Sequence, residues 1–91
     1  MRLRWTPAAA ADLEHIHDYL GEHRPQVLRS TIRRVYDGIR SLKTFPHLGR
    51  PGREEGTREL VFVPLPYVAV YRLKDDVIEI LHIHHGARQW P

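Results

Sequence analysis

The sequence predicts an α+β fold in the order β-α-α-β-β-β, with an antiparallel sheet and a helical hairpin packed on one of its faces. Three observations support this prediction. The first half carries two apolar stripes at helical spacing, a Gly- and Pro-rich segment follows at Pro46–Gly56, and the second half holds three strand-like runs. With 91 residues, the chain is expected to form one domain, residues 1–91, with a modest core.

The chain is predicted to begin with a short strand, Arg2–Trp5, followed directly by a helix. Thr6 suits the N-cap position, and Pro7 suits the first helical position, where its missing N–H is not needed. Gly21 is predicted to end this helix, which would then span Pro7–Leu20. Its apolar stripe consists of Ala9, Leu13, Ile16 and Leu20.

A second helix is predicted from Pro25, and its apolar stripe ends just before Phe45-Pro46. About four residues join the two helices, which is typical of an antiparallel hairpin. The stripe consists of Leu28, Ile32, Val35, Ile39 and Leu42. The opposite side carries Arg29, Arg33, Arg40 and Lys43.

Three strands are predicted after the loop, over Arg58–Val63, Tyr67–Leu73 and Val77–Ile83. Residues 64–66 and 74–76 separate them, and links this short indicate antiparallel pairing. The last strand is apolar on both faces. We therefore expect it to be central in the sheet and covered on both sides.

Composition excludes several classes of protein. The chain has no cysteine, which excludes disulfides and thiolate metal sites and suits a reducing cytoplasm. No apolar run approaches the roughly 20 residues of a membrane span, and the N-terminus lacks the apolar stretch of a signal peptide. The net charge of +3 favours anionic partners, but an excess this small does not select one class. We expect a cytoplasmic protein with no membrane partner.

Histidines near the end of the last strand raise the question of a metal site. His82 and His84 are predicted to point to one face and His85 to the other. A metal would need a further ligand and a hydrogen-bonded outer shell, neither of which the pattern supplies. We expect no metal and no cofactor.

Arginines flank the predicted sheet and form a candidate phosphate-handling site. Arg58 begins one strand and Arg72 lies near the end of the next, so antiparallel pairing would place both at one edge; Arg88 follows the last strand. Guanidinium groups would neutralise charge developing on a phosphate, and His85 would donate or accept a proton near neutral pH. The neighbouring side chains of this candidate site are Glu59, Tyr67 and Tyr71.

A simpler interpretation of the same residues stays open. Arg58 would pair with Glu59, or with a loop acid such as Glu54 or Glu55, and the other arginines would be solvated. Trp90 is interpreted as an anchor whose indole covers a groove beside the sheet or helices. Base stacking is the functional alternative for this tryptophan.

Four stretches, "WTPAAAADLEHIHDYL", "LKTFPHLGRPG", "TRELVFVPLPYVAVYRL" and "IEILHIHHGARQWP", jointly resemble the RelE/ParE superfamily, the toxins of bacterial type II toxin–antitoxin modules. The resemblance runs essentially end to end and in the same order. It implies the β-α-α-β-β-β fold and a growth-inhibiting toxin in a hetero-oligomer with a ParD- or RelB-like antitoxin, which wraps over the helical hairpin and the sheet. An acidic, partly disordered antitoxin segment would suit the basic chain.

The superfamily divides by target. RelE-like members cleave messenger RNA in the ribosomal A site, whereas ParE-like members are linked to inhibition of DNA gyrase. The sequence leans to the ParE side, because Lys43 and Lys74 are its only lysines and no tyrosine follows the last strand. Arg58, Arg72 and His85 still support the RelE alternative, because some ribosome-dependent relatives work with arginine and histidine. A third hypothesis is a small basic module that binds nucleic acid through its second helix.

These hypotheses assign candidate residues. If the protein is a nuclease, its catalytic residues are Arg58, Arg72 and His85. The candidates for contact with the target or a phosphate are Arg58, Glu59, Tyr71, Arg72, Arg88 and Trp90. The candidates for antitoxin contact are Leu13, Ile16, Leu20, Ile32, Tyr36 and Tyr67.

Overall fold

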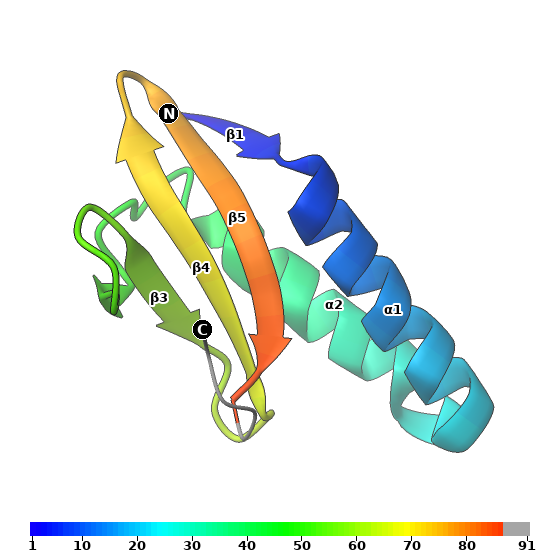
Figure 1. Ribbon diagram of the computed structural model, residues 1–91. Helices are drawn as coiled ribbons and strands as arrows, with labels where there is room; N and C mark the ends of the chain where they lie inside the picture. Colours follow the sequence, from blue (N-terminus) through cyan, green and yellow to red (C-terminus); the bar gives the residue numbers. More distant parts are fainter. Residues whose placement is uncertain (87–91) are drawn as a thin grey trace.

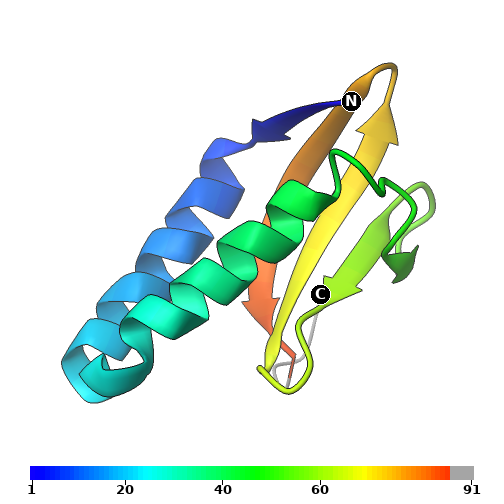
Figure 2. The ribbon, with the colours of Figure 1, turned by 180° about the vertical axis from the view of Figure 1, so that it is seen from behind.

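The computed structural model describes residues 1–86 and contains two helices on one face of a five-stranded sheet (Figures 1 and 2). The strands lie in the order β1-β5-β4-β3-β2 across the sheet. The elements are β1 (Arg2–Trp5), α1 (Pro7–His23), α2 (Pro25–Ser41), β2 (Arg50–Pro51), β3 (Arg58–Val61), β4 (Tyr67–Lys74) and β5 (Val77–His85). This arrangement confirms the predicted α+β fold and helical hairpin. The predictions for Arg88 and Trp90 lie outside the described residues.

The last three strands pair antiparallel, as predicted, but the sheet as a whole is mixed. β1 pairs in parallel with β5, and the other strand pairs are antiparallel. The sequence does not reveal the parallel pair because β1 skips its sequence neighbours and adds to the last strand. The predicted loop also contains the two-residue strand β2, where Pro51 is tolerated because β2 lies at the edge of the sheet.

Helix α1 begins as predicted but does not end at Gly21. The Thr6 side chain caps the helix by accepting a hydrogen bond from the Ala9 N–H at 3.2 Å, with Pro7 in the first turn. The helix continues to His23 because Gly21 only weakens a helix, by about 1 kcal/mol relative to alanine. It ends at Arg24, because the residue before a proline is disfavoured in helical conformation and Pro25 follows.

The apolar stripes of both helices face the sheet and form the core with it. Val35 and Ile39 of α2 and Leu42, the residue that caps its C-terminus, are fully buried, as their spacing predicts. Gly38 packs tightly against Phe62, the residue after β3, because a Cβ there would be 2.5 Å from Cε1 of Phe62. The helical hairpin and the sheet therefore share one hydrophobic layer.

β4 has buried side chains on both of its faces, whereas β5 is fully buried only on the face toward the helices. β4 is central in the sheet, and residues 67–71 are all buried. β5 lies next to β1 and carries one extra residue, Leu81, between the pairs Val70–His82 and Tyr71–Ile80. β5 is an interior strand, between β1 and β4, as predicted. The prediction that both of its faces are covered was wrong, because an apolar sequence pattern does not show what packs on each face.

Candidate functional site

The residues predicted to handle a phosphate do not come together. Arg58 lies opposite Tyr71 in the β3–β4 pair, on the face that carries the helices. Its guanidinium donates hydrogen bonds to the carbonyl of Gly49 at 2.8 Å and to that of His47 at 3.4 Å. The alternative prediction, a pair with a neighbouring acid, also differs from these contacts. Arg58 holds the loop before β2.

Arg72 follows Tyr71 in β4, and its side chain therefore points to the opposite face of the sheet. Its Nε donates to Glu79 Oε1 at 2.7 Å. Arg58 and Arg72 are neighbours in the strand register but lie on different faces. The prediction that both lie at the same edge of the sheet is confirmed by the register. They do not form one site, because the position of a residue along a strand does not show to which face its side chain points.

His85 lies at the other end of β4 from both arginines. It is opposite Tyr67, and the two rings meet edge to face with centroids 5.8 Å apart. Tyr67 is four residues from Tyr71, which corresponds to about 13 Å along a strand. Arg58, Arg72 and His85 therefore do not form one acid–base and charge-neutralising set.

The loop between α2 and β2 is tied to the sheet by Tyr71, which the sequence had suggested as a target contact. The Tyr71 hydroxyl accepts a hydrogen bond from the Gly49 N–H and donates one to the Pro46 carbonyl, both at 2.8 Å. Burial raises the pKa of Tyr71, opposed by the Gly49 N–H and the Arg58 charge. A Cβ at Gly49 would lie 2.7 Å from this hydroxyl and 2.9 Å from the Glu59 carbonyl oxygen. Only glycine fits there.

The loop that is held in this way displays apolar side chains. Phe45 is 61% exposed and Leu48 is 56% exposed, although the backbone between them is fixed by Tyr71 and Arg58. Sequence reasoning missed this surface. The available signal was the pair of large apolar residues inside a segment otherwise typical of a loop.

Glu59 is buried and binds two arginines, neither of which is Arg58. Its carboxylate accepts hydrogen bonds from the Arg50 guanidinium at 3.0 Å and from the Arg53 backbone N–H at 3.3 Å. Burial works against ionisation, but the hydrogen bonds from Arg50 and Arg53 and their positive charges together lower the pKa of Glu59. The Glu59 side chain is 5% exposed, whereas the Arg50 and Arg53 side chains are 60% and 51% exposed.

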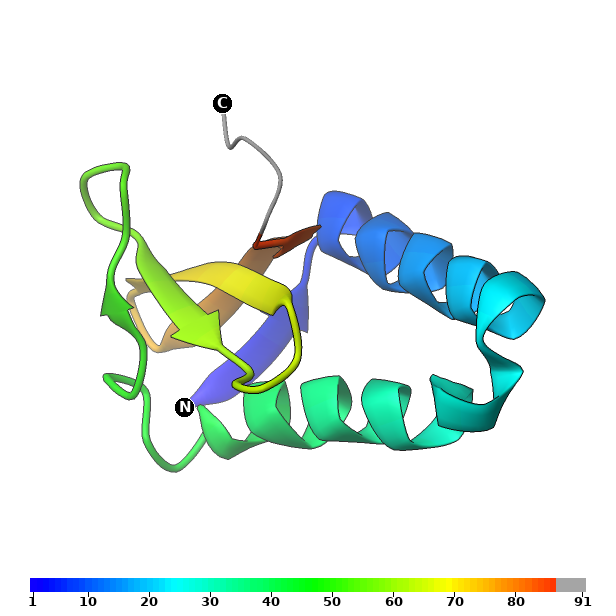
Figure 3. The same ribbon diagram turned by 90° about the horizontal axis from the view of Figure 1, so that it is seen from below.

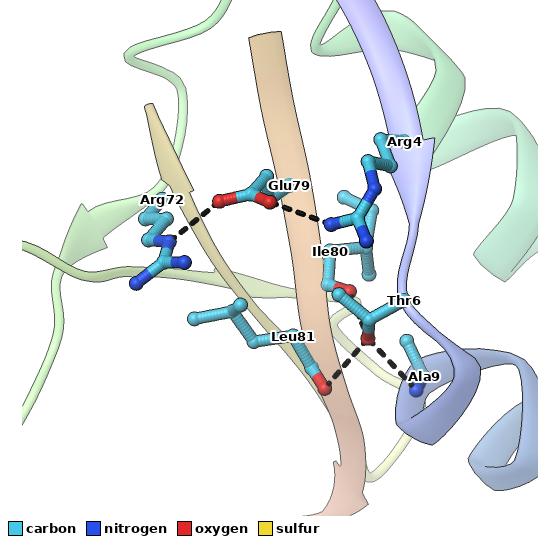
Figure 4. A network of polar contacts seen from close by, with 7 residues as sticks. All are labelled: Arg4, Thr6, Ala9, Arg72, Glu79, Ile80 and Leu81. Atoms are coloured by element: carbon cyan, nitrogen blue, oxygen red, sulfur yellow. Dashed lines mark hydrogen bonds and ion pairs between the residues drawn. The ribbon is translucent and has the colours of Figure 1, made fainter. Parts of the chain in front are cut away.

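Glu79 repeats this arrangement on β5 (Figure 4). Its carboxylate lies between two guanidinium groups. Its Oε2 is 2.6 Å from Nη1 of Arg4 on β1, and its Oε1 is 2.7 Å from Nε of Arg72 on β4. The hydrogen bond from Arg72 is the main cause that lowers the pKa of Glu79, while burial opposes it and the charges of Arg72, Arg4 and Lys74 add to it. Both carboxylates lie on the face of the sheet that no helix covers within residues 1–86.

A groove of about 1530 Å³ opens between the helical hairpin and the ends of β4 and β5. The turn between the helices extends away from the sheet (Figure 3), and side chains of both layers line the space. Three predicted antitoxin contacts, Ile16, Leu20 and Tyr67, line this groove. Tyr19, which is 57% exposed, also lines it and was missed, although it is three residues from Ile16 on the same helix.

The other predicted antitoxin contacts lie elsewhere. Leu13 and Ile32 pack against the core, and Tyr36 stacks on Trp5 with ring centroids 6.4 Å apart. At the rim of the groove, the Asp12 carboxylate accepts a hydrogen bond from the Ile83 N–H at 2.9 Å and lies 3.4 Å from His82 Nδ1. This carboxylate occupies part of the β5 edge that β1 leaves unpaired.

Two further features concern the part of the chain that the structure describes. No group of three or more His, Cys, Asp or Glu side chains within residues 1–86 is arranged to hold a metal ion. Neither α1 nor α2 is long and apolar enough to cross a membrane, and they are the only helices in that range.

Comparison with known proteins identifies the family. A family model described as "ParE toxin of type II toxin-antitoxin system, parDE" matches residues 3–90. The chain is 39% identical over 90 residues to "Putative toxin Y4kP" of Sinorhizobium fredii, covering 99% of this chain and 93% of that protein. It is 39% identical over 84 residues to "Toxin RelE2" of Caulobacter vibrioides, covering 92% of this chain and 93% of that protein.

Solved structures agree with this result. A chain of the "Chromosomal ParDE TA system from P. aeruginosa" matches with a TM-score of 0.84 and 31% identity, covering 93% of this chain and 95% of that one. A chain of the toxin–antitoxin complex RelBE2 from Mycobacterium tuberculosis matches with a TM-score of 0.60 and 25% identity, covering 96% and 92%. The chain belongs to the ParE toxin family of type II toxin–antitoxin systems, within the RelE/ParE superfamily.

Proposed function

We propose that this type II toxin inhibits growth by binding DNA gyrase, without a nuclease step. The observation that carries the proposal is the separation of Arg58, Arg72 and His85. Arg58 and Arg72 lie on opposite faces of the sheet, and His85 lies at the far end of β4. Ribonucleases need a charge-neutralising group and a proton-transfer group on the same phosphate, so this placement favours an inhibitor that acts by binding.

Two further observations support a target of the ParE kind. The TM-score is 0.84 with the ParDE chain and 0.60 with the RelBE2 chain. The loop tied to Tyr71 presents Phe45 and Leu48 from a fixed backbone, and rigid apolar side chains suit recognition of a protein surface. Binding to gyrase would place the toxin in the cytoplasm.

The alternative is a ribosome-dependent endoribonuclease, favoured by the name of the relative "Toxin RelE2". The two functions are separated by testing the purified toxin in a gyrase supercoiling assay and in a translation assay that detects messenger RNA cleavage. We expect supercoiling to be inhibited and the messenger RNA to stay intact. Full supercoiling activity at saturating toxin would rule out the proposed target.

A substitution at His85 tests the nuclease alternative within the same protein. His85→Gln removes the only histidine assigned a proton-transfer role, and its loss from a nuclease would lower cleavage by about 10²-fold or more. Because the proposed inhibitor does not transfer a proton, we expect growth inhibition by His85→Gln to equal that of the unaltered toxin. A toxin that becomes harmless while its thermal melting is unchanged would support the nuclease.

The proposal includes a cognate antitoxin that occupies the groove between the helical hairpin and the sheet. The groove is large enough for a peptide segment, and apolar side chains of α1 line it beside Tyr67. An amphipathic segment that folds as it binds would cover these side chains, and acidic residues in it would suit the basic chain. Co-expression with the adjacent small reading frame should restore growth that the toxin alone arrests.

A further inference from the structure

The face of the sheet opposite the helices carries a band of exposed guanidinium groups, from β1, β4, β2 and the loop after β2, which are bound to carboxylates of β3 and β5. In the register, Arg4, Glu79 and Arg72 lie side by side on β1, β5 and β4, and Val70, Glu59 and Arg50 lie side by side on β4, β3 and β2. Directly paired residues point to the same face. Figure 4 shows Arg4 and Arg72 on either side of Glu79.

In this band the negative side chains are buried more deeply than the positive ones. The side chains of Glu79 and Glu59 are 13% and 5% exposed, whereas the arginine side chains that bind them, those of Arg4, Arg72, Arg50 and Arg53, are 46–60% exposed. Each carboxylate holds two guanidinium groups in place and neutralises one of them. The face therefore presents positive charge outward in fixed positions and keeps a net positive charge in each cluster.

Guanidinium groups in fixed positions are well suited to phosphate, because their planar N–H groups match its oxygens and little side-chain entropy is lost on binding. The two clusters are separated by two strand spacings across the sheet and two residues along it. This corresponds to about 12 Å between the Cα atoms of Glu59 and Glu79. The major groove of B-DNA is also about 12 Å wide, so each cluster would reach one of the backbones that border it.

We propose that the open face of the sheet binds the phosphate backbone of double-stranded DNA through Arg4, Arg72, Arg50 and Arg53. This surface differs from the groove assigned to the antitoxin and from the arginine-bearing side of α2. The contact is independent of base sequence, because the arginines reach phosphates and not base edges. It stands apart from the gyrase target and is measured without gyrase.

The direct test is fluorescence anisotropy of a labelled 20-base-pair duplex titrated with the full-length toxin freed of antitoxin, at several salt concentrations. Four phosphate contacts predict a slope of log affinity against log salt of about −3.6, at about −0.9 for each contact. A slope near zero would overturn the proposal. Equal or tighter binding to a single strand of the same length would also overturn it, because it would assign the face to single-stranded nucleic acid.

A matched pair of double variants locates the surface. Arg50→Gln with Arg72→Gln removes two contacts, while Arg53 and Arg4 keep a guanidinium on each carboxylate and so preserve the fold. We expect the slope to become less steep by about 2. The control is Arg29→Gln with Arg33→Gln on α2, where both side chains are exposed. It removes the same net charge and should leave the slope unchanged.

Further outcomes separate this inference from its alternatives. Equal losses in both double variants would indicate a general charge effect and overturn the assignment to the sheet. Loss of antitoxin affinity with unchanged DNA affinity in Arg50→Gln/Arg72→Gln would assign the face to a protein partner instead. Glu54→Gln with Glu55→Gln, which removes two exposed acids beside Arg53, should raise DNA affinity. If DNA binding fails while supercoiling is still inhibited, this inference alone is wrong.

Discussion

The hydroxyl of Tyr71 in β4 lies 2.8 Å from the backbone nitrogen of Gly49, which precedes it by 22 residues. The same hydroxyl donates to the Pro46 carbonyl, so one side chain satisfies two backbone groups of the loop before β2. The stretch "LKTFPHLGRPG" is thereby joined to the stretch "TRELVFVPLPYVAVYRL". Two of the four stretches that resemble the superfamily are therefore parts of one structural unit.

Tyr71→Phe should therefore destabilise the protein by about 1–3 kcal/mol, because it leaves a backbone N–H and a carbonyl without their partner. The free energy of unfolding is measured by urea denaturation. Tyr36→Phe is the matched control, since Tyr36 is 50% exposed and keeps its ring beside Trp5. Equal stability of Tyr71→Phe and the unaltered protein would mean that the hydroxyl does not hold the loop.

Gly38→Ala should lower stability, whereas Gly21→Ala should raise it. Both glycines are helical, and alanine is favoured in a helix by about 1 kcal/mol. A Cβ at Gly21 would meet Leu28 Cδ2 at an ordinary distance of 3.8 Å, but a Cβ at Gly38 would lie 2.5 Å from the Phe62 ring. Overpacking of this kind costs about 1–3 kcal/mol.

The Gly38 and Gly21 variants are compared by thermal melting and urea denaturation. A more stable Gly38→Ala protein would contradict the close packing of α2 on Phe62. A second test repeats Gly38→Ala in a protein that carries Phe62→Leu and so lacks the ring. In that background Gly38→Ala should lower stability less than it does in the unaltered protein.

Stability should fall on acidification below about pH 4.5. The pKa values of Glu59 and Glu79 are both lowered from 4.5 in the folded protein, so in this range the unfolded chain binds more protons. The stability that these two carboxylates contribute is present above pH 4.5. It is lost as pH falls through their lowered pKa values in the folded protein. Urea denaturation between pH 3 and pH 7 measures the dependence.

Glu59→Gln should remove part of that dependence. At pH 7 we expect a loss of about 1–2 kcal/mol, limited by the exposure of the two arginines. The difference from the unaltered protein should shrink as pH falls, because protonation then removes the same charge. Glu14→Gln on the exposed side of α1 is the control and should follow the unaltered protein at every pH. A constant difference across the range would contradict the ion-pair assignment.

Tyr19→Glu should weaken antitoxin binding without unfolding the toxin, if the antitoxin occupies the groove as proposed. Tyr19 is 57% exposed and lines the groove, so the substitution introduces a charge where an apolar segment would pack. Affinity is measured by isothermal titration calorimetry and should fall by about tenfold or more, the equivalent of 1.4 kcal/mol. Tyr36→Glu places the same charge on α2 outside the groove and should bind the antitoxin normally.

Most of the elements could be predicted from local patterns. The Thr6 cap and the two stripes located the helices, and the three strands after the loop lie within two residues of their predicted bounds. The end of α1 was missed because Gly21 was weighed as a stop, while Pro25 is the stronger one. These are local effects, and the sequence around each residue contains the information needed to predict them.

The site was predicted less well. Arg58, Glu59, Tyr71 and Arg72 were named as candidates for contact with the target or a phosphate, but the partners that the structure gives them were not foreseen. Spacing along the chain cannot show that Tyr71 reaches a loop more than twenty residues away, or that Arg50 and Arg53 bind Glu59.

The sequence by itself determined the helical hairpin, the strand-rich second half and the family, because periodicity and motif order are properties of the chain. Only the tertiary structure decided that β1 pairs in parallel with β5, that β4 is the central strand, and that Arg58 and Arg72 lie on opposite faces. The physical reason is that strand order and side-chain direction depend on contacts between distant segments. Glu79, for example, becomes a link between Arg4 and Arg72 only after three strands have come together.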